Sequence, residues 1–191
     1  AGAFNGNIRN WQTLCVTSME GMFQDVTEFN NSLFWWITIN VTSMKNMFSG
    51  ASKFNQELNW FTPKVNTMSG MFKGASNFNK DISKLLNDSI TNIERMFQNA
   101  SSFNQDISSW RTSKVKTMES MFKGAAAFNQ DIGDWDVSSV ADMSNMFSDA
   151  INFNQDISGW TITNVKNCKN FSNNPDFPTT NQPKFINNCN E

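Results

Sequence analysis

Residues 128–150 read FNQDIGDWDVSSVADMSNMFSDA, and variants of this stretch recur along the chain. Its Phe-Asn pair returns every 24 or 25 residues, at Phe4, Phe29, Phe54, Phe78, Phe103, Phe128 and Phe153. A Met-Phe pair first seen at Met22, a Trp first seen at Trp11 and an aliphatic residue first seen at Val16 keep the same phase. Four series in register indicate about seven copies of one repeated unit.

Each unit carries signals typical of a short helix. The residue two after the Val is Ser, Thr, Asn or Asp in every unit, and these types cap helix N-termini. Seven residues later stand Asp25, Gly50, Gly74, Asn99, Gly124 and Asp149, types that tolerate the left-handed conformation in which helices end. Between them Met-x-x-Met-Phe follows helical spacing. We therefore expect a helix of fewer than two turns per unit, such as residues 19–24.

A short strand is expected around the aliphatic residue that follows each Phe-Asn pair, such as Ile107. Stacked copies would form a parallel sheet with strands about 4.8 Å apart, while helices need about 8–10 Å. The stack would then curve with its strands on the concave side. The fold class expected is an α/β repeat solenoid, with the Phe, Ile, Trp, Val and Met columns as core and the Asn after each Phe as a buried ladder.

The repeats fill residues 1–172, and the first is truncated on its N-terminal side because Ala1 to Phe4 match Ala125 to Phe128. Further repeats or a cap upstream, or a second subunit docked on this end, would cover the first layer. Residues 173–191 hold Pro175, Pro178 and Pro183 and are expected to cap the other end. A disulfide between Cys168 and Cys189 would staple that cap.

The unit FNQDISxWxxSxVxxMxxMFxxA is similar to the BspA-like surface-protein repeats, which are leucine-rich-repeat-like units named from mycoplasma lipoproteins. The similarity runs through many columns of residues 1 to about 172. It implies a leucine-rich-repeat-like arc in a secreted or surface-anchored protein, with a role in adhesion for some members. It implies no catalytic residues and an extracellular or cell-surface location.

The composition argues against several functions. There is no histidine, so the commonest general base and metal ligand are missing, and no catalytic constellation, metal site or cofactor site is recognised. The net charge of −2 gives no sign of the basic surface that nucleic-acid-binding proteins carry. No apolar run is long enough for a membrane span. We expect a protein that is not an enzyme.

Two features of the sequence are not explained by packing of the core. The first is an acidic column at Glu57, Asp81, Asp106, Asp131 and Asp156. Each carboxylate would accept backbone N–H bonds in an Asx-type turn; alternatively, a cation or a basic partner lies along the column.

The second feature is a local excess of aromatic residues at Phe34, Trp35 and Phe61. Trp36 and Trp60 already fill the Trp column, so the surplus rings should be exposed and could contact a protein or a glycan; the alternative is local repacking around a residue missing from the third unit.

Three functions compete. An adhesion or protein-interaction scaffold would bind a protein or glycan ligand on a cell surface. A structural protein would bind copies of itself end to end, in filaments or a surface layer. Ice or polysaccharide binding by a flat lattice ranks below both, because Thr13, Thr38, Thr62, Thr112 and Thr163 do not keep one phase.

Overall fold

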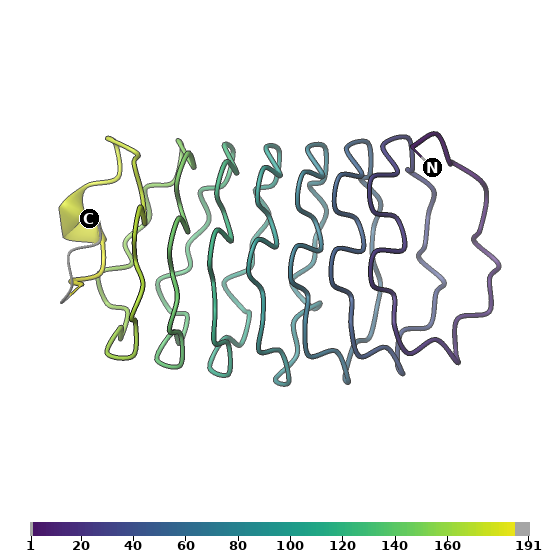
Figure 1. The fold of residues 1–191 in the computed structure, drawn as a ribbon, viewed down its shortest axis with the longest axis horizontal. Coiled ribbons are helices and arrows are strands. Elements are labelled where there is room, and N and C mark those ends of the chain that lie inside the picture. Colours follow the sequence, from purple (N-terminus) through teal and green to yellow (C-terminus); the bar gives the residue numbers. More distant parts are fainter. Residues whose placement is uncertain (1, 186–191) are drawn as a thin grey trace.

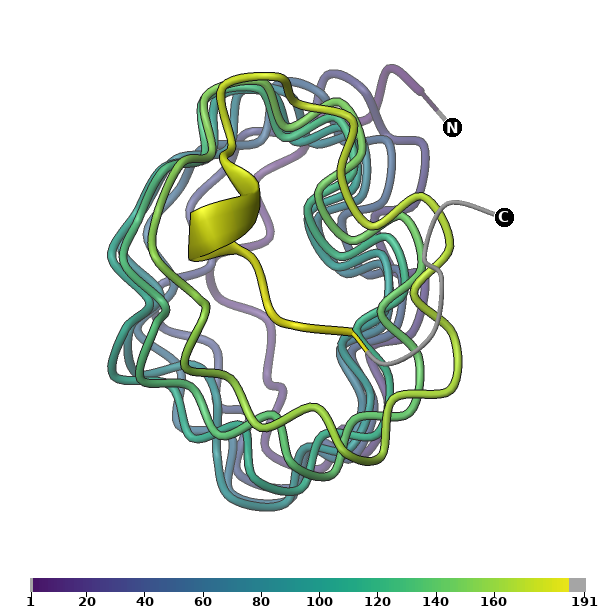
Figure 2. The ribbon, with the colours of Figure 1, turned by 90° about the vertical axis from the view of Figure 1, so that its left-hand side faces the viewer.

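The structure is a computed structural model that describes residues 2–185. The chain winds in successive circuits that stand side by side along one axis, from the purple N-terminal end to the yellow C-terminal end (Figure 1). Each circuit, called a rung here, starts at a Phe-Asn pair. Rungs 1 to 7 cover residues 4–28, 29–53, 54–77, 78–102, 103–127, 128–152 and 153–172. Viewed along the axis, equivalent segments of successive rungs nearly superimpose (Figure 2).

The predicted helices are absent, and the α/β fold class is wrong. Within residues 2–185 the only helix is the 3-10 helix η1, Thr179–Asn181. Regular strands are missing too: in the described residues, parallel pairing is limited to isolated bridges such as Ser18 with Ser43. Residues 2–185 form neither a helix layer nor a sheet, so the expected leucine-rich-repeat-like arc of strands and helices is wrong.

Overlapping turns replace each helix. In rung 1 the N–H groups of Met22, Gln24 and Val26 each bond to the carbonyl three residues earlier. The N–H groups of the alternate residues Met19, Gly21, Phe23 and Asp25 donate instead to rung 2, at 2.7–3.0 Å. In an α-helix these N–H groups would bond to the carbonyl four residues earlier. Here they bond to the next rung, so the segment forms no helix.

Backbone conformation explains this outcome. The expected left-handed residues do have positive φ, between 57° and 73° at Asp25, Gly50, Gly74, Asn99, Gly124 and Asp149. A second positive-φ residue lies four positions before each of these six, inside the predicted helix: Gly21, Asn46, Gly70, Arg95, Ser120 and Asn145. Asn170 has the same conformation at the equivalent position of rung 7. An α-helix cannot pass through such a residue. The expected capping side chains still bond the N–H two residues on, as Ser18 does for Glu20, but within turns.

The predicted strand at the Ile column is also wrong, because side chains connect the rungs there. Each Asn after the Phe accepts the backbone N–H of its equivalent in the next rung, as in Asn129 N to Asn104 Oδ1 at 2.9 Å. The Trp column of rungs 2, 3, 5, 6 and 7 donates its indole N–H groups to the previous rung, as in Trp135 Nε1 to Ile107 O at 3.1 Å. The Asn ladder therefore exists, but its residues are half-buried or exposed, not buried.

The expected core columns are buried in the middle rungs, which confirms the repeat register. The Phe of each Met-Phe pair stacks face to face on the Phe that opens the next rung, such as Phe97 on Phe103 with 3.9 Å between ring centroids. It also stacks on its own equivalent in the next rung, such as Phe97 on Phe122 at 5.7 Å. Buried threonine hydroxyls add bonds between rungs, as in Thr112 Oγ1 to Asp136 O at 2.9 Å. Thr13, Thr38, Thr62 and Thr112 are thus internal and form no exposed lattice.

After rung 7 the chain turns across the end of the stack, where η1 lies (Figure 2). Phe171 and Phe177 pack edge-on against Phe147 and Phe153, with interplanar angles of 79° in place of parallel stacking. Both new rings are buried. The predicted pairing of Cys168 with Cys189 falls outside the described residues, while Cys15 is free and exposed.

Candidate functional site

The surplus aromatic residues lie where rungs 2 and 3 depart from the repeat. Phe34 and Trp35 occupy positions held by Ser108 and Ser109 in rung 5. Their rings meet edge to face with 5.1 Å between centroids, and Trp35 is 63% exposed while Phe34 is half-buried. Phe61 is 70% exposed. The predicted exposure is therefore correct for Trp35 and Phe61 and partial for Phe34.

Four members of the acidic column form the expected Asx-type turns. The carboxylates of Asp81, Asp106, Asp131 and Asp156 each accept the N–H two residues on, at 2.8–3.0 Å. The Ser108 N–H holds the pKa of Asp106 below its ordinary value, and Ser83 and Ser158 lower the pKa of Asp81 and Asp156 in the same way. Bonds to a carboxylate favour its charged form.

Glu57 is the exception, because rung 3 is one residue short. In the other six rungs the aliphatic carbonyl accepts the N–H three residues on, as Ile82 does from Leu85 at 2.9 Å. Leu58 accepts no such bond from the described residues. Glu57 likewise makes no turn bond within the described part of the chain, so its carboxylate is not held against its own backbone.

Rung 4 departs from the repeat at two positions that face rung 3. Lys80 replaces the Gln that elsewhere bonds the Asn ladder, as Gln105 does to Asn79 Oδ1 at 2.9 Å. Leu85 replaces the Trp whose indole would reach the Leu58 carbonyl. Leu58 O therefore has neither of the bonds that its equivalents in neighbouring rungs receive, in the residues that the structure describes.

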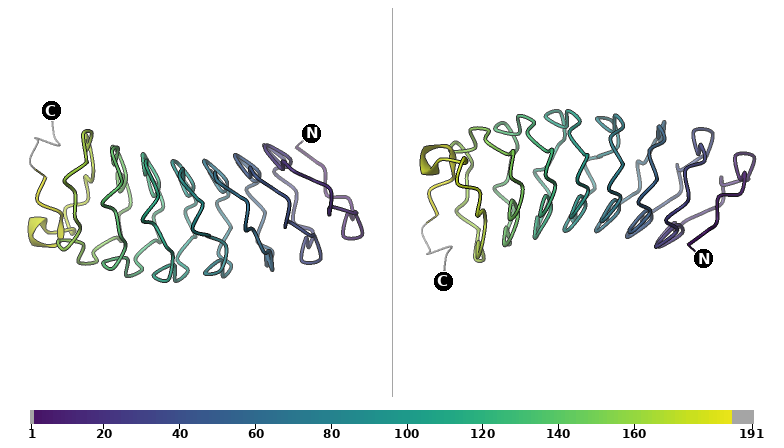
Figure 3. Two further views of the ribbon diagram at one scale, coloured as in Figure 1. Left: turned by 90° about the horizontal axis from the view of Figure 1, so that it is seen from below. Right: turned by 90° about the horizontal axis from the view of Figure 1, so that it is seen from above.

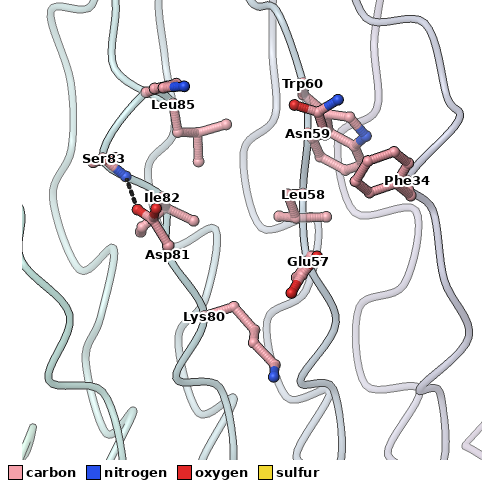
Figure 4. A pocket seen from close by; sticks show the side chains of 11 residues that line it. Phe34, Glu57, Leu58, Asn59, Trp60, Lys80, Asp81, Ile82, Ser83 and Leu85 are labelled. Carbon is pink, nitrogen blue, oxygen red and sulfur yellow. Dashed lines mark hydrogen bonds between the residues drawn. The ribbon is translucent and has the colours of Figure 1, made fainter.

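These departures surround one hollow of about 340 Å³ between rungs 3 and 4. Its walls include Phe34, Glu57, Leu58, Lys80 and Leu85. Trp60 and Phe34 stand on one side, Ile82 and Leu85 on the other, and Lys80 extends along the lower edge toward the rung of Glu57 (Figure 4).

A second hollow of similar volume adjoins the first. It is lined by Arg9, Ser32, Phe34, Trp35, Asn55, Gln56, Glu57 and Lys80, so the two share Phe34, Glu57 and Lys80. We call the two together the groove; it crosses the rungs in the N-terminal half of the stack. Figure 3 shows the ribbon of the stack from below and from above.

The groove unites some predicted residues and leaves others apart. Phe34, Trp35, Glu57 and Asp81 line it, whereas Phe61, Asp106, Asp131 and Asp156 do not. Sequence reasoning missed Arg9, Lys80 and Lys84. The available signal was the clustering of departures, since Lys80 and Leu85 replace regular columns in the rung directly after the shortened one.

No group of three acidic or cysteine side chains within residues 2–185 could hold a metal ion. The only helix in the range, three residues long, cannot cross a membrane.

The same repeat identifies the family. A family model described as "Mycoplasma protein of unknown function, DUF285" matches residues 1–87 and 80–184. The chain belongs to this family. The DUF285 match supports the resemblance to mycoplasma repeat proteins, but not the specific assignment to BspA-like leucine-rich repeats. No curated protein and no solved structure matches the chain.

Proposed function

We propose that this DUF285 chain is a non-enzymatic binding module that acts outside the cytoplasm and contacts a protein or glycan on a cell surface through the groove. The observation that supports this most is the concentration of exposed aromatic and unpaired polar groups where rungs 2 to 4 depart from the repeat. In rungs 5 to 7 the columns of Phe34 and Trp35 hold small or polar residues, and the columns of Lys80 and Leu85 hold the Gln and Trp that bond adjacent rungs. Exposed aromatics beside polar groups are typical of recognition surfaces.

The finer relationship to BspA-like adhesins is part of this proposal. It is supported by the shared spacing of the FNQDISxW and MxxMF segments. A stack of similar rungs suits adhesion because side chains can change on one face while the core columns stay fixed.

The test uses substitutions already present in the repeat. Phe34→Ser with Trp35→Ser introduces the residues of rung 5, so the fold should tolerate the change. Ile151→Ser is the matched control, because Ile151 is 59% exposed in rung 6 and Ser76 and Ser101 are its equivalents. We expect the double variant to lose adsorption of the labelled chain to fixed epithelial cells and the control to keep it. Equal adsorption by all three proteins, or none by the unmodified chain, would overturn the proposal.

End-to-end self-assembly is a second candidate, supported by the first rung. Phe4 and Trp11 stack on Phe29 and Trp36, at 6.1 Å each, yet they are 43% and 55% exposed. A copy docked on this face would cover these rings. Light scattering over a wide concentration range tests it: assembly predicts a rising mass that Trp11→Asp abolishes. Ile8 is buried and unsuitable for this test, because a charge there would destabilise the fold.

A further inference from the structure

The groove collects charged groups that form no ion pair within the described residues. Glu57, Lys80, Asp81 and Lys84 line the first hollow, and none of them forms an ion pair within residues 2–185. Elsewhere acidic and basic residues on adjacent rungs do pair, as Lys53 with Glu28 at 2.6 Å and Arg95 with Glu119 at 2.7 Å. The repeat can therefore form such pairs between rungs, and the groove is where it does not.

The backbone carbonyl of Leu58 adds a hydrogen-bond acceptor to these charged groups. In rung 4 the Ile82 carbonyl accepts from Leu85 N at 2.9 Å and from Trp110 Nε1 at 3.1 Å. The equivalent carbonyl of Leu58 accepts from no described residue, and Leu58 lines the first hollow. A carbonyl left without a donor is costly unless water or a ligand supplies one.

The mixture of groups restricts the ligand. Carboxylates and the carbonyl only accept hydrogen bonds, and ammonium groups only donate them. An anionic ligand would meet Glu57 and Asp81, and a cationic one would meet Lys80 and Lys84. A hydroxyl both donates and accepts hydrogen bonds. A neutral polyol can therefore bond to the carboxylates, the ammonium groups and the carbonyl of the groove without charge repulsion.

The aromatic rings favour a ring-shaped polyol over a flexible one. Phe34 borders both hollows and Trp35 the second, with their planes 76° apart. The C–H face of a pyranose packs against the electron-rich face of an aromatic ring while its hydroxyls point to polar neighbours. The two hollows, of about 340 Å³ each, adjoin along Phe34, Glu57 and Lys80, so a chain of linked rings can occupy both.

We propose that the groove across rungs 2 to 4 binds an oligosaccharide, with Phe34 and Trp35 as stacking surfaces and Glu57, Lys80, Asp81, Lys84 and the Leu58 carbonyl as hydrogen-bonding partners. This inference rests on the proposed binding function and names its ligand class. A peptide ligand is disfavoured because both hollows mix polar and apolar lining, so neither offers a wholly apolar pocket for an anchoring side chain.

Two variants close the groove by restoring the repeat. Leu85→Trp would fill the first hollow with the indole that rungs 3 and 5 carry, and its N–H would reach the Leu58 carbonyl. Lys80→Gln would donate to Asn55 Oδ1, as Gln105 does to Asn79, and remove an ammonium group from the wall. Should Leu85→Trp not fold, Lys80→Gln still tests the site from a half-buried surface position.

The experiment screens the full chain on an array of neutral and acidic oligosaccharides of two to six units, followed by calorimetric titration of those that bind. We expect binding that both variants weaken by about tenfold or more, and that Ile151→Ser leaves unchanged. No bound oligosaccharide, or binding unaffected by either variant, would overturn the inference.

Adsorption to periodate-treated cells separates the two proposals. If the chain still adsorbs through Phe34 and Trp35 after cell-surface sugars are oxidised, its ligand is a protein; the oligosaccharide inference fails and the binding function stands. If adsorption does not depend on Phe34 and Trp35 at all, the proposed function itself fails.

Discussion

At the scale of the residue, the tryptophans do more than fill space. Trp110 is 4% exposed, stacks on Trp135 at 6.1 Å and donates its indole N–H to Ile82 O. Sequence alone predicts the burial of this column. It does not show the hydrogen bond between rungs, because nothing in the spacing says where the indole nitrogen points.

Two substitutions separate packing from hydrogen bonding at Trp110. Trp110→Ala should cost roughly 3–5 kcal/mol of unfolding free energy through the cavity that it leaves. Trp110→Phe keeps an aromatic ring and removes the indole donor, while the Ile82 carbonyl still accepts from Leu85 N, so it should cost only about 0.5–1.5 kcal/mol. Urea denaturation measures both; a cost below about 1 kcal/mol for the alanine variant would show that the residue is not in the core.

The Asx-turn carboxylates should make stability depend on pH. The Ser108 N–H and the Ser138 and Ser158 side chains lower the pKa of Asp106, Asp136 and Asp156 in the folded chain. A lowered pKa contributes stability that is present above the unfolded value of about 3.9 and is lost as the pH falls through the folded value.

Exchanging these three residues for Asn should keep the turn acceptor and remove the titration. We expect the melting temperature of the unmodified chain to fall more steeply below about pH 4 than that of the variant. Thermal melts from pH 6 to pH 2.5 check this, and parallel curves for the two proteins would mean that the carboxylates contribute nothing through these bonds.

At the scale of the element, one overlooked position decided between helix and turns. Gly, Asn and Ser are common at the position of Gly21 and Asn46, yet the Met-x-x-Met-Phe spacing on either side fits a helix equally well. Periodicity reports which side chains face the core, and overlapping turns bury the same ones. In the sequence only this column distinguishes a helix from overlapping turns, because its Gly and Asn residues tolerate a positive φ better than most types do.

Gly70→Ala tests that distinction. In a helix, alanine would stabilise the segment by about 1 kcal/mol relative to glycine. In the observed turn, Gly70 has φ of 60° and an added Cβ would clash with Asn46 Oδ1, so the variant should lose about 1–2 kcal/mol. Lys73→Ala, at an exposed position of the same segment, is the control and should change little. A more stable Gly70→Ala variant in urea denaturation would contradict the turn structure.

At the scale of the whole molecule, the rungs are held by bonds and ring stacks that repeat with little change, and the groove lies where that regularity fails. The sequence predicts the exposed aromatic surplus and the shortened third unit. It does not predict the hollow, which depends on the unbonded Leu58 carbonyl and on the loss of volume from Trp to Leu85 in the adjacent rung.

Amide hydrogen exchange of the chain, free and bound to the glycan or cell-surface glycoprotein that it recognises, tests binding through the groove most directly. Binding through the groove predicts slowed exchange confined to the peptide that holds Arg9 and to peptides within residues 29–37, 55–61 and 78–86, with rungs 5 to 7 unchanged. Protection centred on residues 4–16, or spread evenly over all rungs, would contradict it.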